Sequence, residues 1–533
     1  MEVMESTLAE GSSEGQVEMS AADAPTEKLL DSMETDEPLG DPDALPLPQK
    51  QYFPNPYVAS VTTQAGSSDS EAMNMPPALH PDATPDVLTA LKRETVNLCE
   101  KIVANCKPTD HQAPWDVYSG YSGLARLFLK IHECDPACQI HGLSALKLAE
   151  QYMDTAIANC NSFLRQLKDA KSVCHDVGYL RSQAGVWATG ALIYHHTGNS
   201  ERSAFCLEQL VSMKHMALSA NCPQDFSYGR PGYLYGLLYV RRYLTNAHET
   251  IPNDLVEAIL STVLNDGAEG AQRQFYGPSD RRGYKMDFGQ TRSPFIWLWY
   301  MERYVGAAHG MAGALTSVLS VPSSLLEAVN EAKSDDMPRL EPAGEEERAK
   351  VTPVERALKY LQRRKLANGN YMLRIDDTRT NASQLFEEKE SVQFCHGAPG
   401  VALCLCRGYE VFKKEEYLTA AKEAADLVWK RGLIRKGVGL CHGISGNAYL
   451  FLTLYRLTND IAYWQRAQCF ANVAINWDTT YAPQLTSDRS ASPAQKYGLF
   501  DGIGGLAHLM ADMGFWKEEV FVGFPGFADA FLE

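Results

Sequence analysis

The sequence predicts an all-α fold in which helical hairpins close into a ring. Three observations support this fold class: a turn with two glycines three residues apart recurs along the chain, each copy leads into apolar residues at helical spacing, and strand signals are scarce. The complete copies begin at Gly120, Gly229, Gly310, Gly397, Gly443 and Gly502, and a degenerate seventh copy is Ser182-Gln-Ala-Gly185.

Each turn is predicted to start an inner helix and to leave room for an outer one. After the first turn, Leu124, Leu127 and Phe128 lie at helical spacing, and residues 416–430 show the more amphipathic pattern of an outer helix. The end repeats of an open solenoid need polar capping faces, which neither the first nor the last copy has, so we expect a closed ring. Its glycine turns would then leave backbone N–H groups facing a central mouth.

Segments outside the repeats are assigned from composition. Residues 1–50 contain thirteen Asp or Glu against two Lys, which is typical of a disordered acidic tail. Residues 51–83 hold the aromatic anchor Tyr52-Phe53-Pro54-Asn55-Pro56-Tyr57 and a polar linker. Helical periodicity indicates a ring domain over 84–533, with an exposed acidic insertion predicted at 334–350.

Charge and targeting signals limit the function classes. The net charge of −17, with no basic stripe, argues against nucleic acid as a partner. Neither a secretory signal nor a membrane-length apolar run is visible, so the expected location is cytoplasmic, with peripheral membrane association left open. Thirteen cysteines, an odd number, fit a reducing compartment.

Two neighbouring turns carry the ligand chemistry of zinc. Cys395-His396 and Cys441-His442 each directly precede the first glycine of a turn, so their side chains are expected to converge. If all four bind, the site is a closed structural tetrahedron; if three bind, the fourth position is open and the site is catalytic. Spacing alone does not decide between these alternatives.

Other residues near the turns can supply charge or protons. His309 precedes Gly310 as His442 precedes Gly443, which predicts a general acid or base at the same mouth, although a lone histidine is more often structural. Asp225 and Arg230 flank the turn at Gly229 and are further catalytic candidates. Lys436 can pair with an anionic substrate, against the simpler reading of an exposed surface lysine.

Five motifs together resemble the eukaryotic LanC-like proteins, relatives of the bacterial lanthionine cyclases. They are Tyr228-Gly-Arg-Pro-Gly-Tyr233, Tyr304-Val-Gly-Ala-Ala-His-Gly-Met-Ala-Gly313, Gly369-Asn-Tyr371, Cys395-His-Gly-Ala-Pro-Gly400 and Gly439-Leu-Cys-His-Gly-Ile-Ser-Gly-Asn-Ala-Tyr449. The likeness runs from Phe53 to Phe527, which is nearly everything but the acidic tail.

The resemblance implies a double-layered α/α toroid of seven helical hairpins and assigns roles to the site residues. It implies one Zn²⁺ held by Cys395, Cys441 and His442 with an open fourth position, which makes His396 a non-ligand. The family's histidine and aspartate near the metal match His309 and Asp225, and its glutathione contacts match Lys436 and Arg489. Two departures stand out: Ser391 replaces an arginine of the bacterial enzymes, and Asp501 replaces a glutamate of many eukaryotic members.

The resemblance therefore favours a zinc-dependent transferase that adds glutathione to dehydroalanine or dehydrobutyrine in peptides or proteins. The alternative is a non-catalytic zinc- and glutathione-binding signalling or adaptor protein. A carbohydrate-active enzyme, suggested by fold analogy alone, ranks last because no convincing pair of carboxylates occupies equivalent inner-turn positions.

Overall fold

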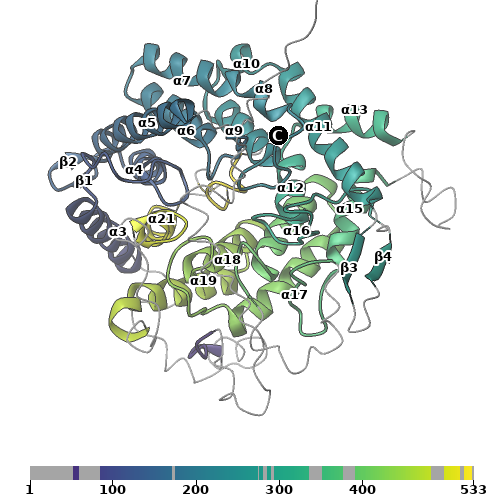
Figure 1. Ribbon diagram of the computed structural model, residues 1–533. Coiled ribbons are helices and arrows are strands. Elements are labelled where there is room, and N and C mark those ends of the chain that lie inside the picture. Colours follow the sequence, from purple (N-terminus) through teal and green to yellow (C-terminus); the bar gives the residue numbers. More distant parts are fainter. Residues whose placement is uncertain are drawn as a thin grey trace, which may run out of the picture.

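A computed structural model describes residues 52–58, 85–170, 174–273, 275–279, 285–289, 293–334, 351–375, 391–481, 497–516, 521 and 523–530. Over these residues the chain forms two concentric layers of helices (Figure 1). The predicted acidic tail lies outside the described residues, as does the predicted insertion apart from Ser334. No helix in the described ranges is long and apolar enough to cross a membrane.

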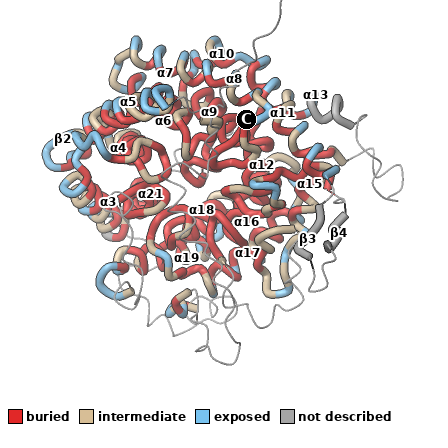
Figure 2. The backbone as a smooth tube through the Cα atoms, in the orientation of Figure 1, coloured by how far each residue is buried: buried red, intermediate tan, exposed pale blue. Residues whose placement is uncertain are grey.

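The inner layer is a closed ring. Its helices in the described chain are α4 (Tyr121–Cys134), α6 (Gln183–His196), α9 (Arg230–Tyr243), α12 (Met311–Val318), α16 (Ala398–Phe412), α18 (Ile444–Thr458) and α21 (Ile503–Gly514). Each packs against the next, and α21 packs against α4. Their residues are buried almost throughout (Figure 2). The predicted α/α toroid is therefore confirmed.

The outer layer covers this ring and contributes one unexpected pairing. It contains α3 (Pro85–Asn105), α5 (Ala145–Asp169), α7 (Ser200–Ser212), α11 (Asn253–Gln272), α13 (Ser323–Ser334), α15 (Pro353–Gln362), α17 (Glu415–Arg431) and α19 (Ile461–Ile475). The helices α5, α7, α17 and α19 pack on the inner helix that precedes each, whereas α21 packs on α3. The seventh hairpin thus joins the two ends of the domain.

Smaller elements decorate the outer layer. They are α8 (Lys214–Ala217), α10 (Ala247–Thr250), the π-helix η6 (Trp477–Tyr481) and two antiparallel strand pairs, β1 (Gln139–Ile140) with β2 (Leu143–Ser144) and β3 (Phe275–Ser279) with β4 (Lys285–Gly289). The first pair aligns Gln139 with Ser144, and the second aligns Phe275 with Gly289. The scarcity of strand signals in the sequence agrees with this arrangement.

The repeated glycines have a steric cause. The second glycine of every turn is the third residue of its helix, where an added Cβ would meet the carbonyl oxygen of the residue six positions earlier; for Gly446 that oxygen belongs to Leu440 and would lie at 1.8 Å. Only glycine allows the preceding loop to fold back this tightly. The degenerate copy keeps this glycine, since a Cβ on Gly185 would lie 1.9 Å from the Tyr179 oxygen, and it replaces only the cap with Ser182, whose side chain accepts a hydrogen bond from Ala184 N.

Backbone hydrogen bonds tie the turns into an annulus at one mouth of the ring. Six of them join residues that stand two positions before an N-cap, each N–H donating to the equivalent carbonyl of the next turn. They run from Ser227 to Ala308 (3.0 Å), Ala308 to Cys395 (3.4 Å), Cys395 to Cys441 (3.3 Å), Cys441 to Phe500 (2.8 Å), Phe500 to Tyr118 (2.9 Å) and Tyr118 to Leu180 (3.1 Å). This annulus fixes the positions of all turn residues relative to one another.

The C-terminal segment 523–530 fills the inside of the ring, where its yellow loop is visible in Figure 1. Phe524 and Phe527 are fully buried. Asp529 forms an ion pair with Arg126 on α4 and accepts a hydrogen bond of 2.5 Å from the Tyr235 hydroxyl on α9. The centre of the toroid is therefore packed by the chain itself.

The aromatic anchor docks on the outside of the ring. Phe53 N donates to Leu433 O at 2.7 Å, and the Phe53 ring packs edge-on against Trp477 and Tyr481 of η6. Only 5% of Phe53 remains exposed, so this segment is a packed part of the fold.

Candidate metal centre and catalytic site

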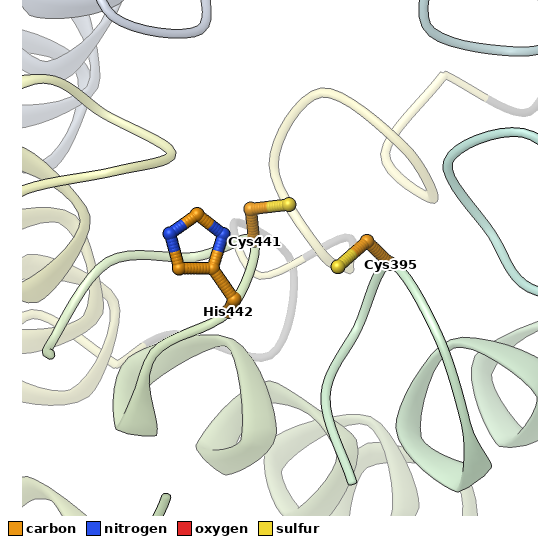
Figure 3. A group of neighbouring side chains, drawn as sticks. All are labelled: Cys395, Cys441 and His442. Atoms are coloured by element: carbon orange, nitrogen blue, oxygen red, sulfur yellow. The ribbon is translucent and has the colours of Figure 1, made fainter. Parts of the chain in front are cut away.

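The three residues expected to bind zinc lie together at the mouth. One ligand atom each from Cys395, Cys441 and His442 lies within 4.8 Å of the others (Figure 3). Cys395 belongs to the loop before α16, and Cys441 and His442 belong to the loop before α18, so the backbone bond between the two cysteines holds the loops in register.

The donor set fits zinc. Zn–S and Zn–N bonds are about 2.3 and 2.0 Å long, so small side-chain adjustments bring two sulfurs and one imidazole nitrogen onto a single ion. Within the described residues this is the group of His, Cys, Asp and Glu side chains that has the spacing for a metal. His396 is not part of the group: its ring lies 5.8 Å from that of Tyr304 and 6.1 Å from that of His309.

The two thiols differ in acidity. A hydrogen bond from Cys441 lowers the pKa of Cys395 well below its usual value, and the imidazoles of His396 and His442 act in the same direction. Burial raises the pKa of Cys441, and the neighbouring Cys395 thiolate adds to this effect. Gln393 Nε2 also donates to Cys395 Sγ at 3.2 Å. Metal binding must therefore displace the Cys441 proton.

A histidine–aspartate pair stands beside the cluster. His309 Nδ1 lies 2.9 Å from Asp225 Oδ2, which also accepts hydrogen bonds from the backbone N–H groups of Ser227 (3.0 Å) and Tyr228 (3.2 Å). These backbone donors hold the fully buried Asp225 carboxylate in place, and Asp225 in turn orients His309. The His309 ring stacks on Trp299 with 3.9 Å between ring centres. Trp299 lies outside the repeated turns, so no sequence motif pointed to it.

Arg230 is not brought to the cluster. Its Nε donates to Ala217 O at 2.6 Å, and its two terminal nitrogens contact Asp266 and Ser219 O. Burial raises the pKa of Asp266 to about 6, although the Arg230 charge opposes that shift. These contacts give Arg230 a role in holding the segment before the third turn, and its catalytic role remains a prediction without support from its contacts.

The two expected glutathione contacts are less defined. Lys436 is exposed in the turn that precedes Cys441. Arg489 lies outside the described residues. Both assignments remain predictions.

The residue directly before each N-cap shows what sequence reasoning missed. In chain order these residues are Ser119, Arg181, Tyr228, His309, His396, His442 and Asp501. Arg181 was overlooked because its turn lacks the first glycine. Comparing this one position across all seven copies would have found it.

Tyr118 and Arg181 connect the degenerate repeat to the cluster. The Tyr118 hydroxyl hydrogen-bonds Cys441, and the Arg181 guanidinium carbon lies 3.6 Å from the centre of the Tyr118 ring. Tyr228 flanks Arg181 at 6.0 Å. Nearby, burial raises the pKa of Asp501 to about 8, while a hydrogen bond of 2.7 Å from Ser119 Oγ and the Arg181 charge both oppose the shift.

These features define a class of protein: an α/α toroid with a Cys–Cys–His cluster and a His–Asp pair at one mouth. Residues 111–524 match the family described as lanthionine synthetase C-like protein. The chain belongs to this family, and the resemblance seen in its motifs is confirmed.

Its relatives cover most of the chain. A zebrafish (Danio rerio) protein named glutathione S-transferase LANCL1 is 28% identical over 424 residues, 79% of this chain and 86% of the relative. The Arabidopsis thaliana LanC-like protein GCL1 is 30% identical over 421 residues, 77% of this chain and 80% of the relative. A solved structure named nisin cyclase covers 82% of this chain and 98% of its own, with 13% identity and a TM-score of 0.47.

Proposed function

We propose that the protein is a zinc-dependent transferase that adds glutathione to dehydroalanine or dehydrobutyrine residues of peptides or proteins. The observation that carries the proposal is the shared mouth: the soft donor set of Cys395, Cys441 and His442 stands next to the ordered pair of His309 and Asp225. A thiol-activating group and a proton-transfer group are the two components that this addition needs.

Cys395, Cys441 and His442 would hold one zinc ion. When bound, zinc supplies the positive charge that favours the thiolate form of an incoming thiol, whose pKa is otherwise about 8.5. With three protein ligands, a fourth position is available to the substrate. His396, whose ring lies against Tyr304 and His309, is free to shape the mouth instead.

His309 and Asp225 are positioned to move the proton. The thiol loses its proton as sulfur attacks the β-carbon; the carbon–carbon π pair moves towards the neighbouring carbonyl; and the α-carbon then gains a proton. The proton lost equals the proton gained, so no redox partner is required. Asp225 holds His309 through Nδ1 and leaves Nε2 to accept and return the proton.

The family and one relative's name support the chemical class. The printed name of the zebrafish relative is a glutathione S-transferase, which agrees with a thiol substrate and a transfer reaction. The peptide acceptor rests on the chemistry of the site and on the family resemblance in the motifs.

The proposal is tested with the purified zinc-loaded chain, glutathione and a dehydroalanine peptide, with the adduct measured by mass spectrometry. We expect the adduct from wild type and its loss in Cys441→Ala. A matched control is Cys404→Ala, a buried cysteine inside α16 that takes no part in the cluster. Wild-type protein that contains zinc and binds glutathione without forming adduct would favour the non-catalytic binding protein instead.

A further inference from the structure

Arg181 is a half-buried cation at the mouth that forms no ion pair with an acid in the described part of the chain. Among the described residues its contacts are the rings of Tyr118 and Tyr228, and no acceptor receives a hydrogen bond from its guanidinium. Other inward arginines differ: Arg126 pairs with Asp529, and Arg230 bonds Asp266 and two carbonyls. None of the Arg181 nitrogens is fully buried without a partner, so its five N–H donors are accessible from the mouth to a ligand that offers an acceptor.

Asp116 and Asp501, the two acids that influence Arg181, each accept a hydrogen bond from Ser119, whereas Asp501 Oδ1 has no hydrogen-bond partner. Asp116 Oδ1 accepts from Ser119 N at 2.7 Å, and Asp501 Oδ2 accepts from Ser119 Oγ at the same distance. Both acids contribute a negative electrostatic potential at Arg181, but neither accepts a hydrogen bond from its guanidinium. The guanidinium therefore remains available to a substrate anion.

Tyr118 places this cation close to the reacting sulfur. The Tyr118 hydroxyl forms a hydrogen bond with Cys441, and Arg181 stacks on the Tyr118 ring. The Tyr118 side chain therefore connects the proposed metal ligand to the guanidinium. The stack also holds the long arginine side chain in one orientation, which lowers the entropy lost when an anion binds.

We propose that Arg181, held on Tyr118, forms an anion subsite for a carboxylate of the thiol co-substrate. The assignment rests on the proposed function, because the sulfur must lie beside Cys441 for the carboxylate to reach Arg181. Glutathione carries two carboxylates, each joined to the cysteine that holds its sulfur by a short, flexible peptide chain. A dehydroalanine inside a peptide is flanked by neutral amides, so the acceptor offers no carboxylate there. A planar guanidinium binds a carboxylate through two parallel hydrogen bonds.

The subsite is tested first by binding, which does not depend on turnover. Calorimetry on the zinc-loaded chain compares glutathione with its diethyl ester, which keeps the thiol and lacks both carboxylates. In wild type we expect glutathione to bind more tightly than its diethyl ester. This ratio of affinities should shrink about tenfold or more in Arg181→Gln. It should be intermediate in Arg181→Lys, which keeps the positive charge but cannot form two parallel hydrogen bonds. An unchanged preference in Arg181→Gln overturns the proposal.

A matched control separates this effect from the loss of an aromatic stack. Arg202 on the outer helix α7 lies 3.9 Å from the ring centre of Tyr194, which is near the end of the inner helix α6. Arg202→Gln removes a similar stack and an ion pair with Asp154 away from the mouth, and should leave the preference unchanged. Melting curves by circular dichroism check that each variant is folded. If Arg181→Gln is not folded, Arg181→Lys is used for the comparison instead.

Kinetics distinguish a carboxylate subsite from a role in the chemical step. In Arg181→Gln we expect KM for glutathione to rise about tenfold, with kcat and KM for cysteamine, which has no carboxylate, unchanged. An equal loss with both thiols would overturn the subsite. Failure of wild type to form any adduct would reject the proposed transferase, while the binding comparison would still decide the role of Arg181.

Discussion

At the scale of single residues, the site combines groups whose positions are set by the same place in different repeats. His309, His396 and His442 all directly precede an N-cap, yet their contacts differ: His442 faces the cysteines, His309 faces Asp225, and His396 lies among aromatic rings. One structural position thus supplies the proposed zinc ligand His442, the proposed proton carrier His309 and the packing residue His396. The residues on adjacent turns determine which contacts each histidine makes.

Replacing His309 tests its assigned role. We expect His309→Ala to lower kcat for adduct formation by about 10² to 10⁴, the usual contribution of a positioned acid or base. Zinc content should stay at the wild-type level because His309 is not one of the three clustered donors. Asp225→Asn should lower kcat as well, because the amide can donate to Nδ1 and favour the wrong tautomer of His309. Loss of zinc from His309→Ala, or undiminished turnover, would contradict this role.

Asp501 predicts a pH effect on stability. Burial raises its pKa to about 8, against about 4 in the unfolded chain. The folded state therefore holds a proton that the unfolded state releases above about pH 4, so this group lowers stability as pH rises from about 4 to about 8. Asparagine resembles the protonated carboxyl and cannot lose that proton.

We accordingly expect Asp501→Asn to melt close to wild type near pH 5 and above it near pH 8. The stability difference should grow by at most about 1.4 kcal/mol per pH unit, the value for one proton. Comparing the two proteins at each pH cancels the titrating groups that they share, including Asp116. A difference that stays constant from pH 5 to pH 8 would show that Asp501 is ionised throughout.

At the scale of elements, the unit of the fold is a loop that crosses the first turn of its own inner helix. The close approach of that loop explains why the second glycine is present in all seven copies and the first in only six. The cap can be a serine, because a side-chain oxygen satisfies a helix N–H as well as water does. A side chain at the second position has no space.

Two glycine substitutions separate this steric role from helix propensity. Gly446→Ala should lower stability by about 1–3 kcal/mol and weaken zinc binding, because its Cβ would lie 1.8 Å from Leu440 O and displace the loop that carries Cys441. Gly236→Ala in α9 is the control: its nearest atom outside the helix backbone would be 3.5 Å away, so helix propensity should leave stability unchanged or raise it by up to about 1 kcal/mol. Equal urea midpoints for the two variants would argue against the steric account.

The steric requirement for glycine also explains which parts of the fold could be predicted from the sequence. Glycine repeats predicted the seven turns, because steric demand leaves only one residue type, and the apolar end repeats predicted the closure of the ring. The partner of α21 could not be predicted, because outer helices share one amphipathic pattern and α3 lies at the other end of the chain. Arg230 was placed correctly beside its turn, but spacing does not reveal that Asp266 and two carbonyls hold its side chain away from the cluster.

At the scale of the whole molecule, two connections close the structure: α3 packs against α21, and the C-terminal segment fills the centre of the ring. Phe527 contacts Phe226 before α9 and Phe394 before α16, so the segment joins turns from separate repeats. The C-terminal segment 523–530, which we call the plug, therefore supports the mouth residues from inside the ring. The backbone annulus links the same residues to one another.

The buried pair of Arg126 and Asp529 tests how strongly the plug stabilises the ring. Both side chains are less than 10% exposed, at 5% and 9%, so Asp529→Ala leaves an unpaired buried guanidinium and removes the acceptor of Tyr235. We expect a loss of about 3–5 kcal/mol in urea unfolding. The double variant Arg126→Met/Asp529→Leu should recover most of that loss, because no uncompensated charge remains.

The control is an exposed ion pair. Asp426→Ala breaks the ion pair with Arg466, in which the Asp426 side chain is 59% exposed, and should cost less than about 1 kcal/mol. Because the plug contacts several repeats, Asp529→Ala should shift one cooperative transition, whereas a separate early transition would mean that the ring holds together without its centre.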